Sequence, residues 1–358
     1  MKTLRLFSAV LPILFTHTVF SSAPGDASAS PDTAMRSYTM DEIVVTSTRR
    51  ATSASTAPSA VTVVRRETID AMPGTLLSAA LSSTPGMSLR AYGGGASVET
   101  ISLRGMSPEH TLVLVDGERS NSFENGLADF GILASSSVER VEILRGGASA
   151  LYGSDAVGGV VNVITRSAGE GMHGSASTML GSSHTSGSAL RLEGGGEGFG
   201  IRGSLEREQG RGDYNFKFND GRTETTLTRA GEDYSLLTGV VRGDWTISPE
   251  LRSSASLSYT DADRGSPGAV TDPASAGKAR LADRLEYIRA GIAWEASPQI
   301  SIRANGSAHY DVEHYDDPGQ ILNGTTIHSI YTNHDGIITP EVLFSFSPAL
   351  SGAAGVEY

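Results

Sequence analysis

The segment Leu251-Arg-Ser-Ser-Ala-Ser-Leu-Ser-Tyr259 alternates apolar or small residues with polar ones. Successive side chains of a β-strand point to opposite faces, so this period of two predicts a strand with one apolar and one polar face. The same alternation recurs at residues 199–206, 237–245 and 300–309. Because these runs follow one another along the chain, they predict an extended antiparallel β-sheet.

The connections between these runs are alternately short and long. Short turns fall at Ser248-Pro249 and Ser297-Pro298, whereas residues 208–233, 261–284 and 311–325 are long polar stretches. Short periplasmic turns and long extracellular loops are typical of outer-membrane β-barrels. A soluble β-sandwich has the same period of two, but it rarely places a long polar loop at every second turn. We therefore favour transmembrane barrel strands over a sandwich.

Composition excludes several classes of protein. The 358 residues contain no Cys, which excludes a disulfide-stapled scaffold, a Cys-ligated zinc site, an iron–sulfur cluster and a thiol nucleophile. The formal net charge of −12 argues against nucleic acid as a partner, because nucleic-acid binders present a basic surface. The 42 Gly and an aromatic content of 6% favour many tight turns over a helical bundle.

Residues 1–23 have the pattern of a secretory signal peptide. Lys2 and Arg5 precede an apolar run, residues 6–20, which leads into Ser21-Ser-Ala23. The run is too short and too interrupted to span a bilayer as a helix. No later segment approaches 18 consecutive apolar residues, so membrane contact would have to come from β-strands or the surface.

Two further segments precede the barrel strands. Residues 24–53 are rich in Ser, Ala and Pro at their start and predict a flexible linker. Residues 54–166 mix strand and helix signals and predict a small α+β domain. Its expected strands are 61–64, 101–104, 111–115, 138–144 and 160–165, and its expected helix is 75–81, with a turn at Asp116-Gly117.

Several motifs in this part of the chain resemble the TonB-dependent outer-membrane receptors. They are Asp41-Glu-Ile-Val-Val-Thr-Ser-Thr-Arg49, Ile101-Ser-Leu-Arg-Gly105, Thr111-Leu-Val-Leu-Val-Asp-Gly117, Val138-Glu-Arg-Val-Glu-Ile-Leu-Arg-Gly146 and residues 149–165. The resemblance implies a plug domain at 54–166 followed, at 167–358, by the N-terminal portion of an antiparallel transmembrane β-barrel. It also implies a place in the outer membrane, in contact with its lipid.

The first motif is similar to the TonB box, through which such receptors contact a TonB-type energy-coupling protein. Its β-branched residues suit an extended segment that adds to the sheet edge of a partner. An ordinary first strand of the plug is the alternative. The residues expected to bind the partner are Asp41, Glu42, Ile43, Val44, Val45, Thr46 and Ser47.

The family implies that a metal-chelate ligand, such as cobalamin or a ferric siderophore, contacts the apices of the plug. The candidate residues are Tyr92, Gly93, Gly94, Gly95, Ala96, Ser97, Asn121, Phe123 and Asn125. The Arg264-Gly-Ser-Pro-Gly268 loop followed by Thr271-Asp-Pro273 is most similar to vitamin B12 receptors. Siderophore receptors share nearly all of the plug motifs, so the ligand stays open.

Charged residues recur around the plug strands. In the family such charges pair with one another and with the barrel wall, which implies a buried polar network of Arg104, Arg140, Glu142 and Arg145. A solvated charged face is the alternative. Gly146-Gly147 and Gly158-Gly159 flank a short helix and are interpreted as positions of tight backbone packing.

Motifs of common enzymes are missing from the sequence. It has no G-x-S-x-G, H-E-x-x-H or G-x-x-x-x-G-K-[ST] motif, so we expect no enzyme and no catalytic residue. One cluster of His and carboxylates consists of His309, Asp311, Glu313, His314, Asp316 and Asp317. Oxygen-rich loops can bind calcium, but polar extracellular loops carry such residues anyway. We therefore expect no resident metal or cofactor, with loop calcium as the alternative.

The number of predicted strands bears on whether the barrel can enclose the plug. A barrel that houses a plug has about 22 strands, whereas residues 167–358 supply eight or nine. We therefore expect an incomplete barrel. One hypothesis is a TonB-dependent receptor for active uptake of a scarce ligand, present in a truncated form. The alternative is a non-transporting fragment, or a small self-contained barrel with a plug-like domain.

Overall fold

The computed structural model divides the chain into two units, Met1–Met40 and Asp41–Tyr358. The described residues all belong to the second unit and are 43–44, 52–53, 60–72, 76–122, 124–219, 221–267, 278–322, 325–347 and 350–358. The predicted signal peptide and most of the predicted linker lie outside them. In this part of the chain, no helix has the length and apolar character needed to cross a bilayer.

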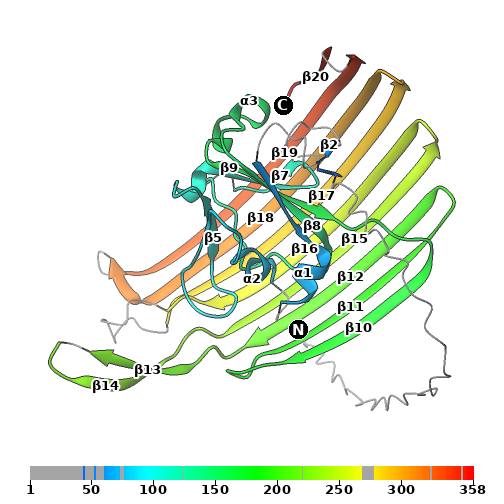
Figure 1. Cartoon of the computed structure of the whole chain (residues 1–358). Helices are drawn as coiled ribbons and strands as arrows, with labels where there is room; N and C mark the ends of the chain where they lie inside the picture. Colours follow the sequence, from blue (N-terminus) through cyan, green and yellow to red (C-terminus); the bar gives the residue numbers. More distant parts are fainter. Residues whose placement is uncertain are drawn as a thin grey trace, which may run out of the picture. The chain divides into compact units, whose positions relative to one another are not determined.

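Most of the second half of the chain forms one nine-stranded antiparallel sheet (Figure 1). Each strand pairs with the next one in the order β10-β11-β12-β15-β16-β17-β18-β19-β20. The strands are β10 (Gly171–Leu180), β11 (Ser186–Gly196), β12 (Phe199–Gly210), β15 (Tyr234–Ser248), β16 (Leu251–Gly265), β17 (Arg280–Ser297), β18 (Ile300–Leu322), β19 (Thr325–Ser347) and β20 (Leu350–Gly355). The predicted antiparallel barrel strands are confirmed.

The two faces of this sheet differ in polarity, as the period of two predicted. Leu257 and Ile288 are 52% and 58% exposed on the outward face. Phe199, Trp245 and Trp294 lie near the short-turn ends of their strands, where membrane barrels gather aromatic residues. Inward positions instead carry buried charged side chains, among them Arg202, Glu206 and Asp283. The outward face therefore suits lipid and the inward face a polar interior.

The three predicted long connections have different outcomes. Residues 208–233 form a long connection between β12 and β15, as predicted, and it contains a separate hairpin, β13 (Tyr214–Asn219) and β14 (Glu224–Arg229). Residues 311–325 belong almost entirely to β18 and β19, each 23 residues long. Polar side chains do not prevent strand pairing, because neighbouring backbones supply the hydrogen bonds. The third loop is shortened, since β16 extends to Gly265 and β17 starts at Arg280.

The first and last strands of the sheet do not pair with each other in the described part of the chain. Each strand is antiparallel to its neighbour, so the first and the ninth strand run in the same direction. Direct pairing of β10 with β20 would therefore be parallel, against the pattern of the whole sheet. The nine strands form a partial barrel, and the alternative of a small self-contained barrel is not what they form.

Residues 60–165 form the small α+β domain, which we call the plug. Its main sheet has the order β3-β8-β9-β6-β7, in which β6 and β9 are parallel and the other neighbours antiparallel. The strands are β3 (Ala60–Arg65), β6 (Thr111–Val115), β7 (Glu118–Arg119), β8 (Val138–Arg145) and β9 (Gly159–Thr165), with β4 (Met87–Ala91) and β5 (Glu99–Leu103) as a separate pair. The predicted plug strands thus have counterparts in the structure.

Short helices connect the plug strands. They are α1 (Arg66–Asp70), α2 (Leu77–Leu81), α3 (Ser149–Tyr152) and the 3-10 helices η2 (Pro108–His110) and η3 (Ser154–Ala156). The predicted helix at 75–81 corresponds to α2, and Thr75 lies outside the described residues. The predicted turn at Asp116-Gly117 joins β6 to β7, and both residues have positive φ angles, 54° and 87°. This geometry suits a two-residue hairpin turn.

The plug has apolar clusters made of its own residues. One includes Phe130, Val141 and Ile143, and the other, formed by residues such as Leu112 and Val160, includes part of α3. A further, smaller cluster joins the plug to the wall of barrel strands. Most of the plug's buried apolar surface is therefore independent of the barrel.

An isolated fragment of residues 54–166 is accordingly expected to fold. The two internal clusters supply its hydrophobic core, and its central strands pair within the fragment. Hydrogen exchange measured by NMR should show protected amides within 112–115 and 160–164. Uniformly fast exchange in both strands would show that the plug needs the barrel strands to fold.

Candidate functional site

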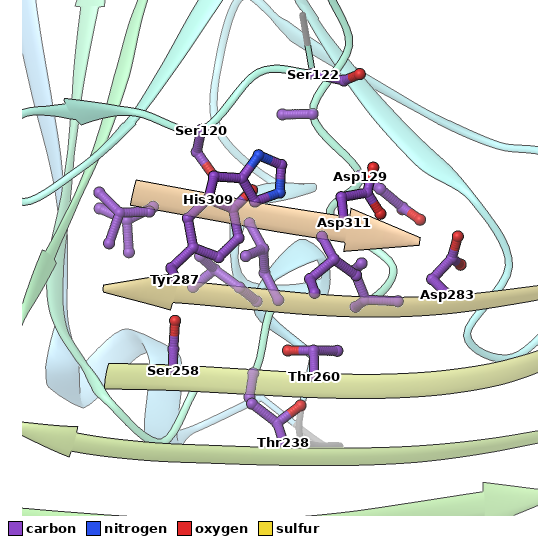
Figure 2. Close-up of a pocket in the computed structure, with 18 of the residues that line it drawn as sticks. Ser120, Ser122, Asp129, Thr238, Ser258, Thr260, Asp283, Tyr287, His309 and Asp311 are labelled. Carbon is purple, nitrogen blue, oxygen red and sulfur yellow. The ribbon is translucent and has the colours of Figure 1, made fainter. Parts of the chain in front are cut away.

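A cavity of about 200 Å³ lies between the plug and the inward face of the wall (Figure 2). The plug contributes the segment around residues 115–138, and the wall contributes strands β15 to β18. Hydroxyl, carboxylate and aromatic side chains share its lining. Those labelled in Figure 2 are Ser120, Ser122, Asp129, Thr238, Ser258, Thr260, Asp283, Tyr287, His309 and Asp311.

Asn121 holds the plug segment that faces this cavity. Its Oδ1 accepts a hydrogen bond from the Val113 amide at 2.7 Å, and its Nδ2 donates to the carbonyls of Thr111 at 3.1 Å and Gly126 at 2.9 Å. The side chain is buried and its amide group is used within the plug. Asn121 thus has a structural role within the plug, and its contact with a ligand stays a prediction.

Arg264 connects the wall to the plug. Its guanidinium donates to Asp129 Oδ2 at 2.6 Å, to the Ala96 carbonyl at 3.2 Å, and to Asp283 of β17. Only 3% of the Arg264 side chain is exposed. The prediction of a loop starting at Arg264 is therefore corrected, because this residue lies in β16 and points inward. Residues 271–273 lie outside the described part of the chain.

Two other wall arginines also bind the plug. Arg242 of β15 donates to Asp116 Oδ2 at 2.8 Å and to Thr165 Oγ1 at 2.9 Å. Arg202 of β12 donates to the Ser136 carbonyl at 2.9 Å. These residues were not predicted from the sequence. The available signal was an arginine on the polar face of an alternating strand, which cannot face lipid and so needs an acceptor inside.

The four residues of the predicted plug network form two separate contacts. Arg140 and Glu142 make an ion pair at 2.8 Å, and the Glu142 side chain is fully buried. Arg104 donates to the carbonyl of Arg145 at 3.2 Å, and Arg145 itself donates to the Thr62 hydroxyl. The contacts lie toward opposite ends of β8. The plug–wall ion pairs instead use Asp116 and Asp129 on the plug side.

The predicted ligand loop at 92–97 packs partly against the wall. A Cβ atom on Gly94 would lie 2.1 Å from Glu232 Oε2, and one on Gly95 would lie 2.4 Å from the Tyr234 ring. A side chain at either position would therefore crowd Glu232 or Tyr234, and Ala96 and Ser97 are buried. Tyr92 is 55% exposed. Of the remaining candidates, Asn125 is exposed and lines the cavity, and Phe123 lies outside the described residues.

The His/carboxylate cluster is divided by the strand that carries it. His309, Asp311 and Glu313 line the cavity, whereas His314 and Asp316 are exposed. Successive strand residues point to opposite faces, so the six groups do not all converge on one ion. Within the described residues, no group of three or more His, Asp or Glu is arranged to hold a metal. The predicted loop at 311–325 is strand, and calcium in extracellular loops stays a prediction.

The predicted TonB box is described only at Ile43–Val44, which form β1. This strand pairs antiparallel with β2 (Thr52–Ser53). The other box residues, Asp41, Glu42, Val45, Thr46 and Ser47, lie outside the described part of the chain. The extended backbone at 43–44 is the conformation that strand addition to a partner requires.

Replacing Glu99 with Gln is expected to raise the free energy of unfolding at pH 7 by about 1 kcal/mol. Burial raises the pKa of the Glu99 carboxyl, and its Oε2 has no hydrogen-bond partner. The folded-state pKa lies above the unfolded value, so protonated Glu99 favours folding at low pH, and this contribution is lost as the pH rises through the folded-state pKa.

Urea unfolding in detergent micelles at two pH values measures this effect. The gain from Glu99→Gln should be present at pH 7 and largely absent at pH 4. Glu67→Gln on the exposed side of α1 is the matched control and should change the free energy by less than about 0.5 kcal/mol. An equal gain at both pH values would contradict the role of ionised Glu99.

Comparison with known proteins was made for the sequence and for the fold. Residues 53–160 match the family model described as TonB-dependent Receptor Plug Domain. Over 127 residues the chain is 38% identical to the vitamin B12 transporter BtuB of Vibrio vulnificus (strain YJ016), which is 36% of this chain and 21% of that protein. This similarity agrees with the motifs that first indicated a plug.

Solved structures share the fold over a larger part of the chain. The ferripyoverdine receptor of the Pseudomonas aeruginosa outer membrane matches with a TM-score of 0.66 and 16% identity, over 88% of this chain and 44% of that one. The siderophore receptor PiuA of Acinetobacter baumannii matches with a TM-score of 0.61 and 19% identity, over 84% and 45%. The chain thus spans about half the length of these structures. The plug-and-barrel fold predicted from the resemblance is confirmed.

Proposed function

We propose that this chain, which carries the plug and barrel strands of a TonB-dependent receptor, serves the energy-coupled uptake of a scarce metal chelate across the outer membrane. The observation that supports this most is the attachment of the plug to the wall by wall arginines. Arg242 and Arg264 pair with Asp116 and Asp129 of the plug. Such contacts hold the plug in the lumen, yet they can be exchanged for water when the plug moves.

The ligand proposed is a cobalamin-like corrinoid, with a ferric siderophore as the second candidate. The corrinoid is favoured because the matched vitamin B12 transporter is 38% identical over 127 residues. The siderophore receptors resemble the chain in fold, at 20% identity or less among those compared above. Tyr92, Gly95 and Asn125 are the predicted contact residues that are exposed, and Tyr92 and Asn125 are the two among them that carry a side chain.

The energy is proposed to arrive through residues 41–47, which would pair as a strand with a TonB-type protein. In the structure β1 already pairs with β2 through its backbone. The same backbone groups can pair with a partner strand when β2 is released. Backbone pairing requires each amide on the bonded edge, so a proline in the strand removes a donor and breaks the pairing.

A peptide of residues 24–60 tests the coupling. We expect capture by the C-terminal domain of a TonB-type protein, and Val45→Pro should weaken the affinity at least tenfold. Val45→Thr is the matched control, because threonine keeps both the amide and the β-branch. Equal capture of the wild type and the proline variant would contradict the proposed pairing.

Equilibrium binding tests the ligand independently. The full chain in detergent should bind cyanocobalamin more tightly than a ferric siderophore. Tyr92→Ala should weaken that binding, whereas Val45→Pro should leave it unchanged. Binding of neither ligand would contradict the proposed uptake role even if the peptide is captured.

A further inference from the structure

The ring of Tyr287 on the inward face of β17 brings two nitrogen-bearing side chains together in the plug–wall cavity. The guanidinium carbon of Arg289 lies 4.4 Å from the centre of this ring. The His309 ring stacks on Tyr287 with 4.2 Å between centroids and 10° between planes. All three residues line the cavity. One end of the cavity therefore carries a cation and an imidazole side by side.

Arg289 has no carboxylate of its own. Its Nε has no hydrogen-bond partner, and the residue forms no ion pair within the described part of the chain. Asp116 and Glu118 are the carboxylates whose charges act on it, but Asp116 is bonded to Arg242 and Thr165. A cation removed from bulk water without an anion is costly. A negative charge bound in the cavity would therefore stabilise the Arg289 cation.

His309 has a second side-chain group without a hydrogen-bond partner at the Arg289 end of the cavity. Its side chain is 9% exposed, and its Nδ1 lies 2.7 Å from Asp335 Oδ1. The other nitrogen, Nε2, is buried and has no hydrogen-bond partner. When both ring nitrogens carry a proton, Nε2 is a donor toward the cavity.

Hydroxyl groups complete this end of the cavity. Figure 2 shows Ser120 of the plug close to Tyr287 and His309, and Ser258 and Thr238 on the neighbouring strands. The carboxylates Asp129 and Asp283 lie at the other end of the picture, where both are bonded to Arg264. These two carboxylates are thus bonded to Arg264 and not to Arg289.

The size of the cavity limits what it can hold. A volume of about 200 Å³ is below the roughly 300–1,000 Å³ of sites for drug-sized ligands, and a whole metal chelate is larger still. A small anion fits. A planar guanidinium binds two oxygens of a carboxylate or phosphate at once, which matches the free donors of Arg289.

We infer that this end of the cavity binds a small oxyanion of the carboxylate or phosphate class between Arg289 and His309. The Ser120 hydroxyl would donate to the same anion from the plug. Because Arg289 and His309 belong to the wall and Ser120 to the plug, the anion would bridge the two. Occupation of this site would add to the plug–wall contacts made by Arg242 and Arg264.

Calorimetry on the full chain in detergent tests the site, with inorganic phosphate and acetate as probes. We expect saturable binding of at least one of the two, with one site per chain. Arg289→Gln should weaken it at least tenfold, and His309→Gln about fivefold. Arg280→Gln is the matched control, since Arg280 pairs with Asp233 and Asp263 outside the cavity. Its affinity should equal that of the wild type.

Thermal unfolding separates loss of the site from loss of the fold. Arg289→Gln removes an uncompensated cation, so its midpoint without added anion should be at least as high as that of the wild type. The anion should raise the midpoint of the wild type and of Arg280→Gln, and should leave that of Arg289→Gln unchanged. Absence of saturable binding to the wild type, or equal affinity of Arg289→Gln, would overturn the assignment.

Discussion

Replacing Arg264 with Ala is expected to lower the free energy of unfolding by about 3–5 kcal/mol, because it leaves Asp129 and Asp283 in the interior without their cation. The same change removes the donor to the Ala96 carbonyl, which belongs to the predicted ligand loop. Urea unfolding in detergent micelles measures the loss. Hydrogen exchange should localise part of it to residues 94–97 of the plug and to the facing ends of β16 and β17.

The loss of stability in Arg264→Ala should be large because the charges that remain are buried. Two control variants test this explanation. Arg280 also pairs with two carboxylates, but its side chain is 40% exposed, so Arg280→Ala should cost about 1 kcal/mol or less. A triple variant, Arg264→Met with Asp129→Asn and Asp283→Asn, removes all three charges and should recover most of the loss. If Arg264→Ala costs no more than Arg280→Ala, Arg264 does not hold the plug.

Much of the fold could be predicted from the sequence because its periods are local. The period of two in residues 251–259 indicates which side chains point outward, and this inference does not depend on which strand lies beside the segment. The plug strands β6 and β9 are short, mostly apolar runs, and β8 mixes apolar with charged residues. The bounds of all three in the structure differ by at most one residue from those predicted. Neither inference needed information about distant parts of the chain.

The errors and omissions came from features that depend on a neighbouring strand. Residues 311–325 are polar and were interpreted as a loop, yet β18 and β19 pair there because each supplies the backbone partners of the other. Asn121 was predicted to contact a ligand because it is polar and near an apex. Its use within the plug depends on the Val113 amide and the Thr111 carbonyl, which a single-sequence pattern does not place beside it.

The site was predicted less well than the fold for the same reason. Arg202, Arg242 and Arg264 lie on three different strands of the wall, and their acceptors lie in the plug at separations of 66 to 168 residues. The alternating pattern shows that each arginine points inward. It does not show which carboxylate or carbonyl lies opposite, because that depends on how the plug docks against the wall.

Substitution in the glycine pair at the start of β9, Gly158-Gly159, is the second change with a large expected effect. Gly159 has a φ of +148°, and a Cβ atom added there would lie 2.3 Å from the Leu144 carbonyl oxygen and 2.6 Å from Leu103 Cδ1. Leu144 belongs to the neighbouring strand β8, so the contact cannot be relieved by a side-chain rotation. Gly159→Ala should therefore lower the free energy of unfolding by about 3 kcal/mol, from the backbone strain and the overpacking together.

Gly147 is the matched control for this substitution, because it lies in the other glycine pair beside the same short helix. A Cβ atom added at Gly147 meets nothing within 4 Å, and its φ is not in the left-handed region. Gly147→Ala should thus be neutral or slightly stabilising, since alanine restricts the unfolded chain more than glycine does.

Urea unfolding of both variants decides between two explanations of the glycines. If the pairs act only by giving the chain flexibility, both substitutions should have similar effects. If close backbone packing is the cause, Gly159→Ala alone should destabilise the plug, and hydrogen exchange should accelerate first at residues 159–163, where β9 pairs with β6 and β8.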